Sequence, residues 1–308
     1  MFRLQSGPLE LAHTHSKGSD QTRSVVFQAA IFGNFKGSQR CVMKIFGYIL
    51  ITLIASVPPH LAKAEEDIFA EYRAMFGDDS PAVLVEMDGE ALWSAPGGEK
   101  NVSLETCDLG LGPGVVDGAY AQLPRYFSDT DKVMDLETRL LWCMETIQGM
   151  DTFELHDRPF SEQGSAQTAL EQLSAFIAAR SNGVQINVPQ GHPKEVEAFE
   201  SGRRLFNFRA GPHDFSCATC HSQDGKRIRL QSLLQLNDPK GAKQSFSTWP
   251  AYRISQGAVR TIEWRMADCA RQQRLPGLVF GSEFAIDLIT YLGVQANGEP
   301  MNVPGLKR

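Results

Sequence analysis

Cys217-Ala218-Thr219-Cys220-His221 is the stretch that decides the fold of this chain. Cys-x-x-Cys-His is the spacing that attaches a c-type haem, because two thiols on one helical turn can add to the haem vinyl groups while the adjacent histidine binds the iron. A zinc half-site or a redox Cys-x-x-Cys is the alternative, but zinc would need a second ligand pair, and no other Cys-x-x-Cys or His-x-x-x-His occurs. The motif predicts one covalent haem c on Cys217 and Cys220, with His221 as an axial iron ligand.

Residues 43–64 have the layout of a secretory signal. A charged start is followed by an apolar run over 45–54 and then by Ala62-Lys63-Ala64, a small-x-small cleavage pattern. A membrane anchor is the alternative, but the run is well short of the roughly 20 residues that a spanning helix needs. We predict a signal peptide over 43–64 and an exported, periplasmic chain that begins near Glu65. Residues 1–42 are polar and precede a suitable start at Met43, so we predict that they are an upstream extension outside the fold.

The charge of the predicted mature chain argues against nucleic acid as a partner. Residues 1–64 hold seven of the 30 Lys and Arg and two of the 36 Asp and Glu, which leaves 23 basic and 34 acidic side chains and a net charge of −11. Such a surface repels a polyanion. The 244 residues that follow position 64 suit two modest domains or one large one.

Cysteine usage leaves one thiol unaccounted for. Five cysteines follow the signal: Cys107, Cys143, Cys217, Cys220 and Cys269. Haem attachment uses two, and in an oxidising compartment the other three are expected to form one pair and leave one odd thiol. Reactive chemistry is expected at the odd thiol.

Two segments of the chain match in order and spacing. Glu137-Thr138-Arg139-Leu140-Leu141-Trp142-Cys143 and Glu263-Trp264-Arg265-Met266-Ala267-Asp268-Cys269 both read Glu-x-Arg-apolar-x-x-Cys, and each cysteine lies 19 residues after a proline. Upstream, Leu104-Glu105-Thr106-Cys107-Asp108 corresponds to the haem motif but lacks one cysteine and the histidine. The first copy therefore cannot bind haem in the same way.

The repeat predicts a mainly α fold of two cytochrome c-like domains. We place them at 65–185, without haem, and at 190–308, with haem, joined through the Gly- and Pro-containing stretch 180–191. Cys107 and Cys143 stand where they would have flanked a haem, so we predict a disulfide between them. Closing that loop would contribute roughly 4 kcal/mol in the chain-entropy model, which could offset part of the loss of the cofactor. The first half is interpreted as scaffold.

Coarse secondary structure is predicted as mainly helical in the second half. Apolar spacing and the flanking glycines and prolines predict helices over 193–206, 257–274 and 282–292, with Val196, Phe199 and Leu205 on a buried stripe of the first of them. Residues 82–87 and 91–93 of the first half are predicted as short strands.

The sixth ligand of the iron has three candidates. Met266 and Met301 are the methionines that an electron-transfer cytochrome would use, and Cys269 competes with them as the odd thiol. Met266 and Cys269 are three apart on one predicted helix, so both could lie near the haem. We favour Cys269 as the ligand and Met266 as a core side chain.

Arg265 precedes Cys269 by four residues, which places both on one helical face. A guanidinium beside a thiolate is expected to lower the pKa of that thiol and to offer a fork of donors to an oxyanion. A contact with a haem propionate, or a surface pair with Glu263 or Asp268, is the alternative. The neighbouring odd thiol favours a role in a reactive site.

Taken together, these residues resemble the SoxA subunit of the SoxAX cytochrome complex of bacterial thiosulfate oxidation, the enzyme called L-cysteine S-thiosulfotransferase. The resemblance rests on the signal, the motif Cys217–His221, the segment Trp264–Cys269 and its repeated version that ends at Cys143. SoxA chains carry two haems or one, and Leu104 and Asp108 in place of the missing cysteine and histidine predict the single-haem kind.

The resemblance implies that Cys269 is both the distal iron ligand and the catalytic residue, a cysteine persulfide, and that Arg265 binds thiosulfate. It implies that thiosulfate is joined oxidatively to a cysteine of the carrier protein SoxYZ through a persulfide or thiosulfonate adduct on Cys269. Electrons would pass to c-type haem. Because one haem cannot accept two electrons at once, a second haem protein is needed, and the family supplies the cytochrome SoxX as the partner in a heterodimer.

Two other functions stay open at this stage. A periplasmic electron-transfer cytochrome c would use His221 and Met266 as its iron ligands and leave Cys269 without a role. A thiosulfate dehydrogenase that makes tetrathionate is the weaker alternative, because such enzymes usually present two haem motifs and only one is found here.

Overall fold

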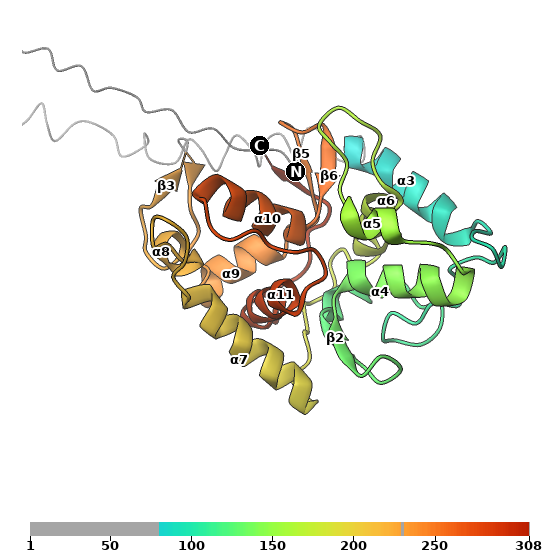
Figure 1. Cartoon of the computed structure of the whole chain (residues 1–308), viewed down its shortest axis with the longest axis horizontal. Helices are drawn as coiled ribbons and strands as arrows, with labels where there is room; N and C mark the ends of the chain where they lie inside the picture. The colour runs from blue at the N-terminus through green and yellow to red at the C-terminus, as the bar shows by residue number, and fades with distance from the viewer. Residues whose placement is uncertain (1–79, 229–230, 308) are drawn as a thin grey trace, which may run out of the picture. The chain divides into compact units, whose positions relative to one another are not determined.

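A computed structural model describes residues 80–228 and 231–307 (Figure 1). The predicted extension over 1–42, the signal over 43–64 and the start near Glu65 lie outside the described residues. Within the described ranges, none of the helices combines the length and apolar character that crossing a membrane requires.

Helices dominate the described chain. They are α3 (Pro81–Ser94), α4 (Leu136–Cys143), α5 (Phe153–Asp157), α6 (Ala169–Ala179), α7 (Pro193–Asn207), α8 (Cys217–His221), α9 (Pro239–Phe246), α10 (Ile262–Gln273) and α11 (Glu283–Gln295), with a 3-10 turn η3 (Tyr120–Gln122) and a π turn η4 (Met144–Gln148). The strands are β1 (Arg125–Phe127), β2 (Lys132–Met134), β3 (Arg227–Ile228), β4 (Gln231–Ser232), β5 (Ala251–Arg253), β6 (Ala258–Arg260) and β7 (Gly305–Lys307).

The internal repeat is visible as a hairpin followed by a helix in each half. β1 pairs antiparallel with β2, and β5 pairs antiparallel with β6. The pair Arg125↔Met134 corresponds to Ala251↔Arg260, because each residue of the second pair lies 126 positions after its counterpart. Each hairpin follows a cis X-Pro bond, at Pro124 and at Pro250. In the second half β7 adds a parallel strand to β5 and completes a three-stranded sheet in the order β6-β5-β7.

The helix after each hairpin begins at an equivalent cap. Asp135 accepts a hydrogen bond from the backbone N–H of Thr138 at the start of α4, and Thr261 accepts one from Trp264 at the start of α10. These caps satisfy backbone donors that the first helical turn leaves free. Cys143 ends α4 and Cys269 lies in α10 at the same repeat position.

Each half also contains a pair of helices that cross at a glycine. α3 packs on α6, and α7 packs on α11. A Cβ atom added at Gly89 would lie 2.1 Å from the carbonyl oxygen of Gln172, and one added at Gly202 would lie 1.9 Å from that of Asp287. The backbones of the paired helices therefore touch, and only glycine fits at either crossing.

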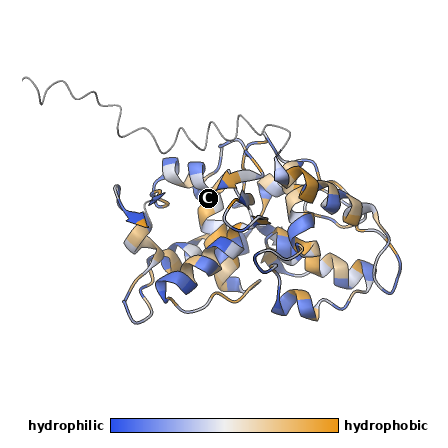
Figure 2. Ribbon diagram, turned by 90° about the horizontal axis from the view of Figure 1, so that it is seen from above, coloured by the Kyte–Doolittle hydropathy of each residue, from blue (hydrophilic) through white to orange (hydrophobic). Residues whose placement is uncertain are grey.

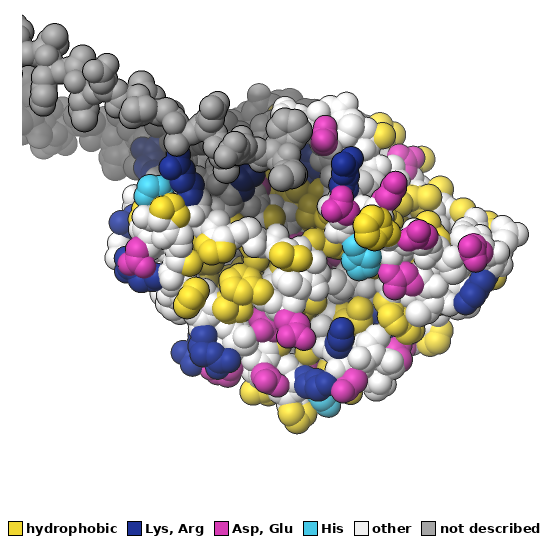
Figure 3. All heavy atoms as spheres, viewed as in Figure 1, with side chains coloured by type: hydrophobic (Ala, Val, Ile, Leu, Met, Phe, Trp, Pro, Cys, Tyr) yellow, Lys and Arg dark blue, Asp and Glu magenta, His cyan; other side chains and the backbone are white. Residues whose placement is uncertain are grey.

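One hydrophobic core runs through both halves. Leu140 and Ile177 of the first half belong to the same cluster of buried side chains as Phe206, Phe246 and Leu288 of the second. Hydrophobic and hydrophilic segments alternate along the helices (Figure 2), as expected for elements with one buried face. On the face drawn in Figure 3, basic and acidic side chains are interspersed, with hydrophobic ones between them.

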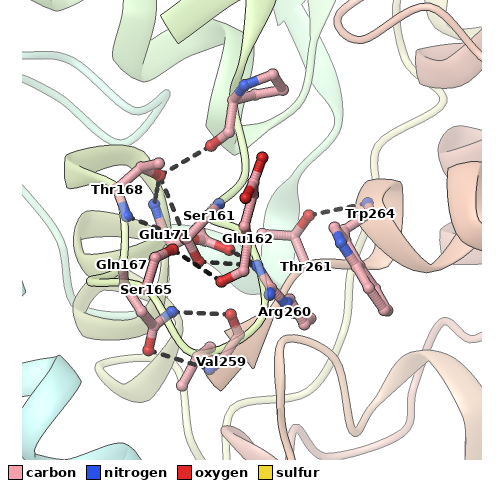
Figure 4. A network of polar contacts seen from close by, with 11 residues as sticks. Ser161, Glu162, Ser165, Gln167, Thr168, Glu171, Val259, Arg260, Thr261 and Trp264 are labelled. Atoms are coloured by element: carbon pink, nitrogen blue, oxygen red, sulfur yellow. Dashed lines mark hydrogen bonds and ion pairs between the residues drawn. The ribbon is translucent and has the colours of Figure 1, made fainter. Parts of the chain in front are cut away.

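Buried polar contacts also join the halves (Figure 4). Arg260 at the end of β6 forms an ion pair with Glu171 of α6, and both side chains are almost completely buried. The Gln167 amide donates to the carbonyl oxygen of Val259 at 2.9 Å and accepts from its N–H at 3.1 Å. The second hairpin is therefore anchored on the first half.

Two predictions about secondary structure were wrong. Residues 82–87 and 91–93 are not strands but parts of the single helix α3, because Ser80 caps the helix and Pro81 stands at its first position. The predicted helix over 257–274 began too early, because residues 258–260 pair with β5 as strand β6 and the helix starts only at Ile262. It ends at Gln273, and Arg274 takes a left-handed conformation.

The other predicted helices are confirmed with small shifts. The prediction over 193–206 corresponds to α7, and that over 282–292 to α11, which Ser282 caps. Val196 is exposed rather than buried, because α7 turns Ala198, Gly202 and Phe206 toward the core instead.

The disulfide predicted between Cys107 and Cys143 is present. Both cysteines are completely buried within the main core, and they are 36 positions apart. The bond ties the loop before η3 to the end of α4.

Candidate functional site

The haem motif forms the short helix α8. Ser216 caps this helix, and its hydroxyl accepts a hydrogen bond from the N–H of Thr219 at 3.2 Å. One helical turn separates Cys217 from Cys220, so both thiols are presented from a single turn. The imidazole Nδ1 of His221 lies 2.9 Å from the carbonyl oxygen of Leu234 and donates to it. That bond fixes the tautomer in which Nε2 is free to bind a metal.

These residues fit haem c. The two thiols and the histidine have the required order, all three are partly buried, and Cys217 packs against the main core. Burial lowers the pKa of His221, and Arg265 lowers it further, so the imidazole is neutral at pH 7, as a metal ligand must be. In the described ranges no group of three or more His, Cys, Asp or Glu side chains could hold a metal ion.

Cys269 lies beside the haem motif although it is distant in sequence. Burial raises the pKa of Cys217, and the nearby Cys269 raises it further through electrostatic repulsion, so that this pKa is about 11. Cys220 in turn acts on Cys269. Of the cysteines in the described part of the chain, these three are the ones with free thiols. The structure therefore brings the odd thiol of α10 to the two thioether positions of α8.

The pKa of Cys269 differs from the prediction in its direction. Burial raises it, and this effect exceeds that of Arg265, which lowers it as the sequence had suggested. Asp268 adds a raising effect. Another influence, such as coordination of the sulfur to a cation, would be needed to lower the pKa of Cys269 and favour the thiolate.

Arg265 forms an ion pair one turn along its own helix. Its Nη1 lies 3.1 Å from Oδ2 of Asp268, which also pairs with Arg271 and accepts from Gln272. This pair with Asp268 is one of the alternatives that the sequence left open for Arg265. Arg265 keeps 27% of its side chain exposed, so the guanidinium remains accessible. Its charge acts on Cys269, His221 and Arg253.

The two methionine candidates have different surroundings. Met301 is buried in the main core, and Met266 is partly buried and packs against that core. Both therefore have a packing role that accounts for them without iron.

The first half holds a counterpart of this site in which Leu104 and Asp108 replace one cysteine and the histidine. Cys107 is bonded to Cys143, and Asp108 stands where the histidine would be and accepts from the N–H groups of Gly110 and Gly112. The counterpart of Arg265, Arg139, is buried and forms a bidentate ion pair with Asp129, at 2.8 and 3.0 Å.

Arg139 is also held between two aromatic rings. Its guanidinium carbon lies 4.1 Å from the ring centroids of both Phe127 and Trp142. Its Nε donates to the carbonyl oxygen of Asp108 at 2.7 Å. In the first half this arginine is therefore a structural residue with no accessible charge.

Sequence reasoning missed the arginines that surround Trp264. Arg253 of β5 and Arg260 of β6 lie over this ring, with guanidinium carbons 5.6 and 5.0 Å from its centroid. Figure 4 shows Arg260 and Trp264 beside the contacts with α6. The counterpart of Arg253 in the first half is Phe127, which contacts Arg139.

A protein-family model matches the chain twice. The model of the family described as SoxA/TsdA, cytochrome c domain, matches residues 88–186 and again residues 201–301. The double match confirms that the chain contains two cytochrome c-like domains, as the repeat predicted.

Relatives of known name are also similar over most of the chain. L-cysteine S-thiosulfotransferase subunit SoxA of Hydrogenophilus thermoluteolus is 48% identical over 238 residues, which cover 77% of this chain and 86% of that protein. The SoxA subunit of Hydrogenobacter thermophilus is 35% identical over 229 residues, covering 74% and 82%. The crystal structure of SoxXA from P. pantotrophus has a similar fold, with a TM-score of 0.62, 24% identity, and coverage of 75% of this chain and 80% of that one.

Proposed function

The chain belongs to the SoxA family, and from that membership we propose that it is the haem c subunit of an L-cysteine S-thiosulfotransferase that joins thiosulfate to a cysteine of a carrier protein. The observation that carries the proposal is the position of Cys269. This thiol lies beside the haem motif, and Arg265 stands one helical turn away. A plain electron carrier would need neither residue there.

The reaction balances as an oxidative coupling. The Cys269 thiolate and thiosulfate form a thiosulfonate, Cys269–S–S–SO₃⁻, and release two electrons. The carrier thiolate then attacks the sulfur next to Cys269, takes the S–SO₃⁻ group, and returns Cys269 as a thiolate. A cysteine persulfide is the other sulfur adduct that Cys269 would carry. Haem c, held by Cys217, Cys220 and His221, would supply the one-electron acceptor for this oxidation.

The roles of the side chains follow from their chemistry. Cys217 and Cys220 would hold the haem covalently, with His221 and Cys269 as its axial ligands. Arg265 presents its fork of donors one turn from Cys269, where it would bind the sulfonate oxygens and orient the sulfur toward the thiol. The first half would act as scaffold.

Two electrons require a second acceptor, because one haem takes one electron at a time. We assign that role to a SoxX-type cytochrome c bound as a heterodimer, and the carrier to a SoxYZ-type protein. A relative of similar fold is described as SoxXA, which supports the first assignment. The signal over 43–64 supports a periplasmic location.

The test is electron paramagnetic resonance of the ferric holoprotein together with its turnover. Cys269→Ala is expected to abolish a thiolate-type low-spin signal and thiosulfate-dependent reduction, while the haem stays attached. Met266→Leu is the matched control on the same helix, and it should leave both unchanged. A histidine/methionine signal that Met266→Leu alters and Cys269→Ala does not would instead support the electron carrier.

A further inference from the structure

Arg253 is a cation near the proposed reactive site, where Asp268 acts on it electrostatically. It is half-buried at the end of β5, and its Nε is inaccessible and has no hydrogen-bond partner. Among the described side chains, no carboxylate forms an ion pair with it. Burial lowers its pKa, and Arg265 and then Arg260 lower it further, while Asp268 raises it, so the surroundings as a whole disfavour the charged form.

Arg260, the other arginine over Trp264, does form an ion pair with a carboxylate. Arg260 is neutralised by Glu171, and its Nη1 also lies 3.0 Å from the hydroxyl of Ser161 (Figure 4). One face of the indole therefore belongs to the structural contact between the halves. Arg253 uses the same ring as a support but is not part of that contact.

The repeat indicates where Arg253 lies relative to Arg265. Phe127 and Trp142, which enclose Arg139 in the first half, correspond to Arg253 and Asp268 in the second, each 126 positions later. Arg265 does contact Asp268, at 3.1 Å. The same correspondence predicts that Arg253 lies beside Arg265, and the charge of Arg265 does act on it.

The charges around Asp268 do not balance. Three arginines (Arg253, Arg265 and Arg271) interact with this one carboxylate, which leaves two positive charges in excess within the group. Two guanidinium groups repel each other unless an anion is shared between them. An excess of two charges matches a dianion.

We propose that Arg253 is a second anion-binding residue of this site, which together with Arg265 binds the oxyanion end of a small dianionic ligand. The proposal rests on the proposed function, in which that oxyanion is the sulfonate of thiosulfate. A haem propionate carboxylate offers the same chemistry to a guanidinium fork. Trp264 is the positioning residue, because its ring supports the Arg253 guanidinium from one side.

The first experiment measures binding rather than turnover. Thiosulfate is titrated calorimetrically into the ferric holoprotein of the wild type, Arg253→Gln and Arg253→Lys. Arg203→Gln is the matched control, since it removes the same charge from an exposed position on α7 that pairs with Glu200 one turn away. We expect Arg253→Gln to raise Kd at least tenfold, Arg253→Lys to raise it less, and the control to change it less than twofold. Arg253→Lys keeps the positive charge, so its Kd still tests the proposal if Arg253→Gln does not fold.

The midpoint potential of the haem distinguishes the two sources of the anion. If Arg253→Gln shifts the potential and weakens its pH dependence but leaves Kd unchanged, the anion that Arg253 binds is a propionate. If the variant folds with haem and changes neither quantity, the proposal is overturned. A wild type that binds no thiosulfate would contradict the proposed function, and the potential would still decide whether Arg253 binds an anion.

Discussion

Glu137 and Glu263 occupy the same position in the two repeats, and both are buried where the starts of α4 and α10 meet. Each is a carboxyl group in the first turn after a capping residue. Burial raises the pKa of both, and Asp135 raises each of them further. One oxygen of Glu263 accepts from the N–H of Gly281 at 2.8 Å, while the other has no partner. The pseudo-symmetry thus places like groups together, and they avoid repulsion by keeping protons.

This cluster predicts that stability falls as the pH rises. The pKa of Glu137 is raised to about 8 in the folded chain, against an ordinary value of 4.5. Between these values the folded state binds more protons than the unfolded state, so the free energy of unfolding decreases with pH across that window. We expect Glu137→Gln, which cannot ionise, to flatten this decrease and to stabilise the protein at pH 8. Urea denaturation from pH 5 to 9 measures it, and parallel curves for the two proteins would contradict it.

The control variant must lie away from the groups that face the Glu137 carboxyl. Asp135, Glu263 and Tyr120 all interact with it electrostatically, and Thr261 donates a hydrogen bond to it. Glu90→Gln provides the control, because that carboxylate is exposed on α3. It should leave the slope of stability against pH as it is in the wild type.

The disulfide should stabilise the first half without affecting the haem site. Replacing both Cys107 and Cys143 with alanine removes a crosslink over 36 positions, which costs about 4 kcal/mol in the chain-entropy model. We expect the free energy of unfolding to drop by an amount of that order while the absorption spectrum of the folded holoprotein is unchanged. A loss of haem in the folded double variant would show that the bond serves the second half as well.

The helix crossings predict sensitivity to a single methyl group. Gly202→Ala would place a Cβ 1.9 Å from a carbonyl oxygen of α11, so the two helices must separate. Overpacking of this kind costs about 1–3 kcal/mol or more. Gly191→Ala is the control, because nothing lies within 4 Å of its added Cβ. Thermal unfolding of both variants compares them, and equal melting temperatures would exclude a close crossing.

The buried ion pair between the halves gives a further prediction. Arg260→Met leaves Glu171 as a buried carboxylate without its cation, and breaking such a pair costs about 3–5 kcal/mol. Arg271→Met changes the same residue type at an ion pair in which the arginine is 75% exposed, so we expect a change within about 0.5 kcal/mol. Chemical denaturation distinguishes the two, and equal small effects would mean that the halves do not depend on this contact.

Local patterns in the sequence predicted the features that depend on residues close together in the chain. α7, α8 and α11 begin at capping residues that stand beside them, and Arg265 and Cys269 share a face because they are four residues apart. The strand over 258–260 was missed because its pairing with β5 is decided by tertiary structure. Arg253 was missed for the same reason, since the hairpin rather than sequence spacing brings it to Trp264.

The direction of the Cys269 pKa could not be predicted from spacing either. The neighbouring arginine is visible in the sequence, but the burial that outweighs it depends on how α10 packs. The glycines at the helix crossings could be identified from the sequence by comparing the two repeats. Gly89 and Gly202 are 113 positions apart, as are Leu104 and Cys217.

The last prediction concerns the number of haems. Leu104→Cys combined with Asp108→His restores the Cys-x-x-Cys-His spacing in the first half, yet we expect the haem-to-protein ratio to remain at one. Cys107 is committed to its disulfide, and the Arg139 guanidinium fills the space between Phe127 and Trp142. The pyridine haemochrome spectrum and the mass of the intact protein measure the ratio, and His221→Ala provides a control in which the second-half site loses its axial histidine. A second covalent haem in the restored variant would show that the motif alone, and not the packing around Arg139, decides whether the first half takes the cofactor.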